Sequence, residues 1–145
     1  MSDFEELGGM DRLRTLMDDF VSRVFDDVMI GFLFRNASRE RVAQMETLFA
    51  ARMLGAQGIE YPGKSIREAH APHPIMGGQF MRRQTLLKQT LEHHGVDPAI
   101  VSRWLAHNES LRHLVTGDRA GHCDEVAATK RIRVQPSSGR SSSGT

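Results

Sequence analysis

Seven histidines are the side chains of this 145-residue chain best suited to bind a metal. Imidazole nitrogen ligates zinc, copper, iron and nickel, and His70 and His73 fall on one predicted element. No acidic residue completes an obvious zinc set beside them, and Cys123 lies far along the chain. The His93–His94 pair precedes a helix-ending glycine, where polar or cationic side chains suit the helix dipole. These patterns favour no zinc site, and they leave His70 either a metal ligand or a structural core histidine.

Residues 58–65, Gly-Ile-Glu-Tyr-Pro-Gly-Lys-Ser, match the phosphate-loop pattern letter for letter. That loop binds phosphates when a buried strand leads into it and its backbone N–H groups point at the ligand. Here the preceding residues have a helical pattern, Pro62 removes a donor, and Glu60 would repel phosphate. We therefore interpret the match as accidental, and a nucleotide-binding switch is the least favoured function.

Composition excludes several classes of protein. Nineteen Lys and Arg against 18 Asp and Glu give a formal charge of +1, so the net charge gives no indication of a nucleic-acid partner. One cysteine excludes an internal disulfide and fits a reducing compartment. The longest apolar run, residues 28–34, is far shorter than the roughly 20 residues that span a bilayer, and the acidic N-terminus is unlike a signal peptide. We expect a cytoplasmic protein with neither a membrane nor a nucleic-acid partner.

The apolar residues recur with a helical period in the first two thirds of the chain. Steps of three and four predict a helix over about residues 10–27. A second helix is expected to begin after the capping residue Ser38 and to end at Gly55. No stretch alternates with period two, which indicates an all-α fold.

Capping signals predict three further helices. Ser65 and Glu68 form a capping-box pair, so a short helix should begin there and carry His70. The fourth helix should end at Gly95. Asp97, followed by proline at the first helical position, should begin the fifth, whose apolar face runs on to Leu114.

The last part of the chain has a different composition. No aromatic residue follows Trp104, and residues 137–145 contain five Ser and two Gly. Such a segment buries too little apolar surface to offset its ordering entropy. We predict a globular domain over residues 1–117 and a flexible tail over 118–145. The core of such a domain is small, and a large cofactor could form part of it.

Several short motifs follow one another along the chain. They are Leu7-Gly8-Gly9, Asp19-Phe20, Phe32-Leu33-Phe34, Gly55, Tyr61-Pro62-Gly63, Arg67-Glu68-Ala69-His70, Phe80 and a C-terminal amphipathic helix. Each is weak alone, but in this order and at these spacings the chain resembles the truncated haemoglobins, nearest to their group I. The match covers roughly residues 4–115. It implies a truncated globin-like two-over-two helical sandwich around haem b (iron protoporphyrin IX).

The resemblance also implies a site. His70 stands where the family has the proximal ligand to haem iron, which leaves the opposite axial position open. Phe34 matches the phenylalanine that packs on the haem face, although it could also be plain core. Lys64 and Arg67 could pair with the haem propionates or simply be solvated. Candidate pocket residues by the same comparison are Phe20, Val21, Val42, Met45, Glu46, Phe49, Ile66, Ile75 and Phe80.

The distal side departs from the family. A tyrosine typically stands where this chain has Val21, and other donors often stand at the positions of Val42 and Glu46. An apolar pocket lets O2 leave quickly. Glu46, if buried, could donate as a neutral acid, and Gln44 could turn inward although its helical position points elsewhere. Met45 is either a sixth iron ligand, as thioether sulfur can be, or an ordinary core methionine.

The function that the resemblance implies is binding of O2, NO or CO at haem iron. The roles left open are NO detoxification of the nitric oxide dioxygenase type, which needs a reductase, O2 handling or transport, and gas sensing. The alternative from another class is a haem-free globin-like bundle that serves as an interaction module. The missing distal tyrosine is its only support, and the presence of His70 argues against it.

Overall fold

The computed structural model describes residues 1–60 and 75–116, which are entirely helical or irregular in these two ranges. Its elements are α1 (Asp3–Leu7), α2 (Gly9–Asp26), the 3-10 helix η1 (Gly31–Phe34), α3 (Arg39–Met53), α5 (Gly77–His93), α6 (Pro98–Ser110) and α7 (Arg112–Thr116). The expected all-α class is confirmed. The predicted tail, residues 118–145, and the predicted short helix that carries His70 lie outside the described residues.

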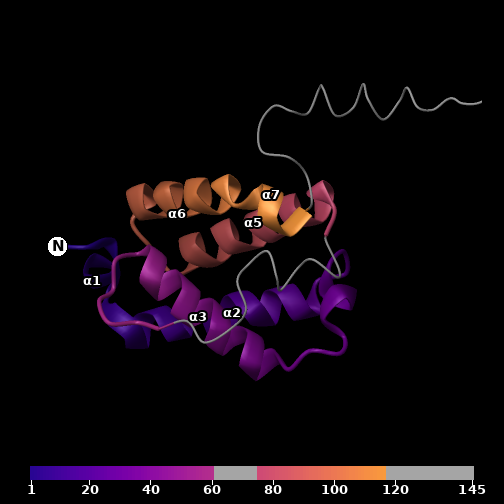
Figure 1. Cartoon of the computed structure of the whole chain (residues 1–145), viewed down its shortest axis with the longest axis horizontal. Helices are drawn as coiled ribbons and strands as arrows, with labels where there is room; N and C mark the ends of the chain where they lie inside the picture. Colours follow the sequence, from indigo (N-terminus) through magenta and orange to yellow (C-terminus); the bar gives the residue numbers. More distant parts are fainter. Residues whose placement is uncertain (61–74, 117–145) are drawn as a thin grey trace, which may run out of the picture.

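Helix α2 is the element against which α1, η1, α3 and α5 pack. It contacts α3 on one side and α5 on another, and α5 in turn pairs with α6, so that two pairs of helices form two layers (Figure 1). Its buried side chains recur at three- and four-residue steps, as an amphipathic helix requires. They are Leu13, Leu16, Met17, Phe20, Val21 and Val24. The predicted two-over-two arrangement is therefore present.

Two capping residues predicted from the sequence, Ser38 and Asp97, begin helices in the structure. Ser38 Oγ accepts a hydrogen bond from the Arg41 N–H at 3.1 Å, and Asp97 Oδ1 accepts from the Ala99 N–H at 2.8 Å. Each satisfies a backbone donor that the first turn of a helix leaves without a partner. Gly55, at a φ of 102°, adopts a backbone conformation that side-chain-bearing residues avoid, which ends α3 as predicted.

Two local details differ from the sequence expectation. Asp3–Leu7 form a short helix that the sequence analysis did not predict, and Ser2 and Glu5 make a reciprocal capping box at its start. The last predicted helix does not continue to Leu114. It stops at Ser110, where the Leu111 N–H bonds to the Asn108 carbonyl in a tighter turn at 3.0 Å, and α7 begins after it.

The end of α3 and the start of α5 lie near opposite ends of α2. The Phe4 N–H donates to the Leu54 carbonyl at 2.9 Å, which places the end of α3 beside α1. Arg82, in the second turn of α5, binds Asp27 immediately after α2 ends. Because 18 residues of helix extend about 27 Å at 1.5 Å per residue, the end of α3 and the start of α5 are far apart.

The interface between α2 and α3 is built from small side chains on α3. Its buried residues are Ala43, Thr47, Ala50 and Ala51, which recur at steps of four, three and one. The Thr47 hydroxyl donates to the Ala43 carbonyl at 2.8 Å, so burying it leaves no unsatisfied polar group. Small side chains let two helix axes approach closely, and the larger residues of α3 must then lie on another face.

Asp27 fixes the start of α5 against the end of α2. Its Oδ1 accepts from Arg82 Nη2 at 2.7 Å, and its Oδ2 accepts from the Met29 and Ile30 N–H groups. The Arg82 hydrogen bond, the largest cause, holds the pKa of this carboxyl below its ordinary 3.8, although burial acts in the opposite direction. Only 5% of the Asp27 side chain is exposed.

Asp27→Asn should lower the free energy of unfolding at pH 7 by about 1–3 kcal/mol, since a charge-assisted hydrogen bond to a buried group is lost. The folded-state pKa is lowered, so the stabilisation is present above 3.8 and is lost as pH falls through the lower folded value. The difference from wild type should therefore shrink at pH 3. Urea denaturation at both pH values measures it.

Asp26→Asn is the matched control for this substitution. Asp26 pairs with Arg39 at 2.9 Å, but 70% of its side chain is exposed, so its loss should cost less than about 0.5 kcal/mol. Equal effects of the two variants would contradict a special role for Asp27.

Ala51→Leu should destabilise the fold by about 1–3 kcal/mol, because three added carbons do not fit between closely packed helices. Ala51 is 0% exposed. The exposed neighbour Arg52, changed to Leu, provides the control and should alter the melting temperature little. A full-stability Ala51→Leu variant would show that the α2–α3 contact is looser than described.

Candidate functional site

A second face of α3 carries most of the predicted distal residues. Val42, Met45, Glu46 and Phe49 follow one another at steps of three, one and three, which places them along one stripe of the helix. We call these four residues the α3 stripe. All four are half-buried, whereas the small residues beside them are fully buried against α2. The structure therefore brings the predicted set together outside the α2–α3 interface.

The α3 stripe contains the large apolar side chains that the interface cannot hold. Val42 packs against the edge of the described core, and Met45 and Phe49 are half-buried on the same face of the helix. Large apolar side chains that lie beside a core without filling it are the surface that an apolar ligand covers. The stripe is thus the described part of the chain best suited to contact a flat apolar group.

The other predicted pocket residues lie at the helix ends and in the core. Phe20, Val21 and Phe80 are 1%, 1% and 3% exposed. Phe34, at the end of η1, is half-buried and stacks on Phe25 with ring centroids 5.2 Å apart. Val21 supplies neither a hydroxyl nor any other donor, so the polar group typical of the resembled family is absent from this position.

Ile75 begins the second described range and is half-buried. Its N–H donates to the Val115 carbonyl at 3.0 Å, which ties the approach to α5 to helix α7. The remaining predicted residues, Lys64, Ile66, Arg67 and His70, lie in the segment 61–74 outside the described residues, and their roles stay predictions.

Glu46 forms an ion pair across the molecule. Its Oε1 accepts a hydrogen bond from Arg83 Nη2 on α5 at 2.9 Å, and 27% of the Glu46 side chain is exposed. The Arg83 guanidinium also lies over the ring of Phe20, 5.0 Å from its centroid. Glu46 is therefore half-buried and paired with a cation, and its role as a donor to a bound gas stays a prediction.

Gln44 and Met45 are the two other residues that the sequence analysis considered for the distal side. Gln44 is exposed, and the helical spacing directs it away from the stripe, so it gives no support to an inward-turned amide. Met45 lies on the stripe, and its role as a sixth ligand stays a prediction.

Arg83 is the site residue that the sequence interpretation missed. It follows Phe80 by three residues and precedes Leu87 by four, and both of these side chains are buried. It therefore lies on the apolar face of α5, where a basic residue is unexpected. A basic residue on an otherwise apolar helix face was therefore the available signal in the sequence. Its partner could not be identified from spacing, because Glu46 on α3 is 37 residues away along the chain.

Two other kinds of site receive no support. Within residues 1–60 and 75–116, no three His, Cys, Asp or Glu residues gather where they could hold a metal ion. The phosphate-loop match follows helix α3 rather than a strand, as the sequence interpretation expected, and most of its residues lie outside the described ranges. None of the described helices has the length and apolarity needed to cross a bilayer.

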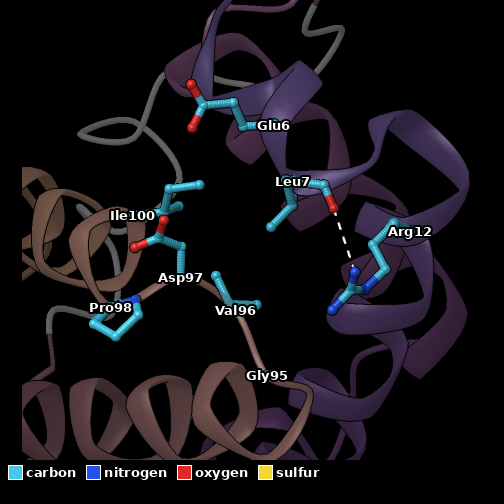
Figure 2. A pocket seen from close by; sticks show the side chains of 8 residues that line it. All are labelled: Glu6, Leu7, Arg12, Gly95, Val96, Asp97, Pro98 and Ile100. Atoms are coloured by element: carbon cyan, nitrogen blue, oxygen red, sulfur yellow. Dashed lines mark hydrogen bonds between the residues drawn. The ribbon is translucent and has the colours of Figure 1, made fainter.

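A separate cleft of about 440 Å³ lies between the start of α2 and the turn before α6 (Figure 2). Its main charged groups already have structural partners. Arg12 donates to the Leu7 carbonyl at 3.4 Å and to the His94 carbonyl at 2.6 Å, and Asp97 caps α6. The cleft therefore lacks the convergent polar groups of a binding site.

Comparison with solved structures identifies similar folds. The truncated haemoglobin of Tetrahymena pyriformis in its Fe(III) form matches with a TM-score of 0.75 and 24% identity, covering 81% of this chain and all of that one. The 2/2 haemoglobin of Synechococcus with covalently attached haem gives 0.73 and 22%, with the same coverage. The group II truncated haemoglobin of Bacillus anthracis gives 0.72 and 20%, covering 86% of this chain and 97% of that one.

No protein-family model matches the chain, and no curated protein matches it significantly. Sequence identities of 20%, 22% and 24% are evidence about the fold alone. The resemblance found in the sequence is confirmed at that level: the chain has the two-over-two helical fold of the truncated haemoglobins.

Proposed function

We propose that this chain is a haem protein that binds a diatomic gas, O2, NO or CO, at iron held by His70. The observation that carries the proposal is the α3 stripe. Its large apolar side chains lie half-buried beside an interface already filled by alanines, in a fold shared with haemoglobins. A half-buried apolar helix face in this fold is the kind of surface that a flat apolar cofactor covers.

The described residues fit the chemistry of a haem group. Haem is a flat apolar macrocycle with an anionic edge, and Val42, Met45 and Phe49 offer an apolar surface of matching character. Phe34 adds half-buried aromatic surface at the end of η1, whereas Phe80, near the start of α5, is already buried. From the segment outside the described ranges, His70 would be the axial ligand, Ile66 would add apolar contact, and Lys64 and Arg67 would meet the propionates.

When bound, haem iron supplies the gas-binding and redox chemistry. The chain's own contribution is to hold the group, exclude water and set the polarity of the gas pocket. Because Val21 cannot donate a hydrogen bond, that part of the pocket should release O2 faster than a pocket with a hydroxyl donor. Oxidation of NO would additionally require a reductase, whereas reversible gas binding would not.

Titration of hemin into the full-length protein should produce an intense Soret band at one equivalent. His70→Ala should bind hemin more weakly and lose the spectrum of an imidazole-ligated iron, because its axial ligand is removed. Added imidazole should restore that spectrum. His73→Ala, three residues further along the same segment, is the matched control and should titrate like wild type.

A wild-type protein that stays colourless and takes up no hemin would overturn the proposed function and favour the haem-free module. An unchanged spectrum in His70→Ala, together with a lost one in His73→Ala, would move the ligand to His73.

The ferrous protein without added gas should have a five-coordinate, high-spin spectrum. Met45→Leu, a substitution that keeps the side-chain volume, should leave that spectrum unchanged, because we expect Met45 to line the pocket rather than ligate iron. A low-spin ferrous spectrum that disappears in Met45→Leu would instead assign Met45 as the sixth ligand.

A further inference from the structure

Arg83 contacts two residues of the proposed pocket. Its Nη2 donates to Glu46 Oε1 at 2.9 Å, and its Cζ lies 5.0 Å from the centroid of the Phe20 ring. Phe20 is the neighbour of Val21, the position without a donor, and Glu46 belongs to the α3 stripe. The guanidinium therefore links α5 to α3 and α2 through two residues of the proposed pocket.

The neighbouring arginine shows that this placement is specific. Arg82 is held by Asp27 at the end of α2, so its role is to join helix ends. Arg83 projects from the apolar face of α5, between the buried residues Phe80 and Leu87, and only 23% of its side chain is exposed. An ordinary solvated arginine would not occupy this face, because removing a guanidinium from water is costly unless it gains partners.

The two contacts of Arg83 hold its guanidinium in a fixed plane. A guanidinium has five N–H donors in a rigid fork, and its ion pair with Glu46 uses one of the nitrogens. The contact with the Phe20 ring fixes the plane from the other side, as cation–aromatic contacts do. Donors that point away from Glu46 are thereby oriented in advance, which is the arrangement that recognises negative charge at little entropic cost.

We propose that Arg83, oriented by Glu46 and Phe20, is the hydrogen-bond donor of the gas pocket, and that it makes the pocket selective for small anionic ligands and strongly polarised diatomic ligands. This inference rests on the proposed function. It replaces the hydroxyl that Val21 lacks with a charged donor from another helix. Glu46 then acts as a positioning residue, because it holds the guanidinium and tempers its charge.

Azide binding to the ferric, haem-loaded protein tests the inference directly. Arg83→Met should weaken azide binding about tenfold to a hundredfold, the effect of losing one charge-assisted hydrogen bond. Glu46→Gln should bind azide more tightly than wild type, because a negative charge near the anion is removed. Lys88→Met removes an exposed charge from the same helix and should bind azide as wild type does.

The carbon–oxygen stretching frequency of the ferrous CO complex gives a second readout. A positive charge beside the CO oxygen draws electrons into the antibonding orbital, so Arg83→Met should raise the frequency. A purely structural role for Arg83 would leave it unchanged. If Arg83→Met does not fold, Arg83→Gln retains a neutral donor, and it should still raise the frequency and weaken azide binding.

The outcomes separate the two proposals. Wild-type protein that takes up no hemin would overturn the proposed function and this inference with it. Wild-type protein that takes up hemin, with azide affinity and CO frequency unchanged in the Arg83 variants, would overturn this inference alone.

Discussion

The close contact between α2 and the alanine face of α3 is the constraint on which the rest of the structure depends. Ala43, Ala50 and Ala51 leave no room for larger side chains between the two helices. Packing at native density then requires the bulk that α3 carries to project along a neighbouring face. The α3 stripe is the consequence. The small residues of α3 therefore both allow the two helices to approach closely and leave its larger apolar side chains on a neighbouring, half-buried face.

Polar contacts at the helix ends hold the second layer in register with the first. The Asp27–Arg82 pair fixes the start of α5, and His94 Nε2 lies 2.8 Å from Asp19 Oδ2 near its end, so α5 is tied to α2 at both ends. A hydrogen bond from Arg23 is the main cause that keeps the pKa of Asp19 below its ordinary value. Because α5 is fixed at both ends, a side chain in its middle, such as Arg83, is presented to α3 at a defined distance.

The sequence allowed prediction of what is local. Ser38 and Asp97 mark the helix starts by their own hydrogen bonds, and the period of α2 directly reports which face is buried. Helix α1 escaped recognition because five residues are too few to show a period, although its Ser2–Glu5 capping box was visible. The Arg83–Glu46 pair could not be predicted from spacing, since it depends on how α3 and α5 are both placed on α2. The family resemblance revealed a missing donor at Val21 but could not show the Arg83–Glu46 pair.

A guanidinium and a phenol would give such a pocket different chemistry. A tyrosine hydroxyl both donates and accepts and can lose its proton, whereas a guanidinium only donates and stays charged. The half-buried Glu46 carboxylate stays paired with Arg83 and reduces the positive charge that a ligand meets. A ligand that carries negative charge of its own still gains a charge-assisted hydrogen bond from the remaining N–H donors, whereas a neutral and weakly polarised one gains less. Selectivity in the proposed pocket would therefore arise from the charge that the Arg83–Glu46 pair leaves facing the ligand.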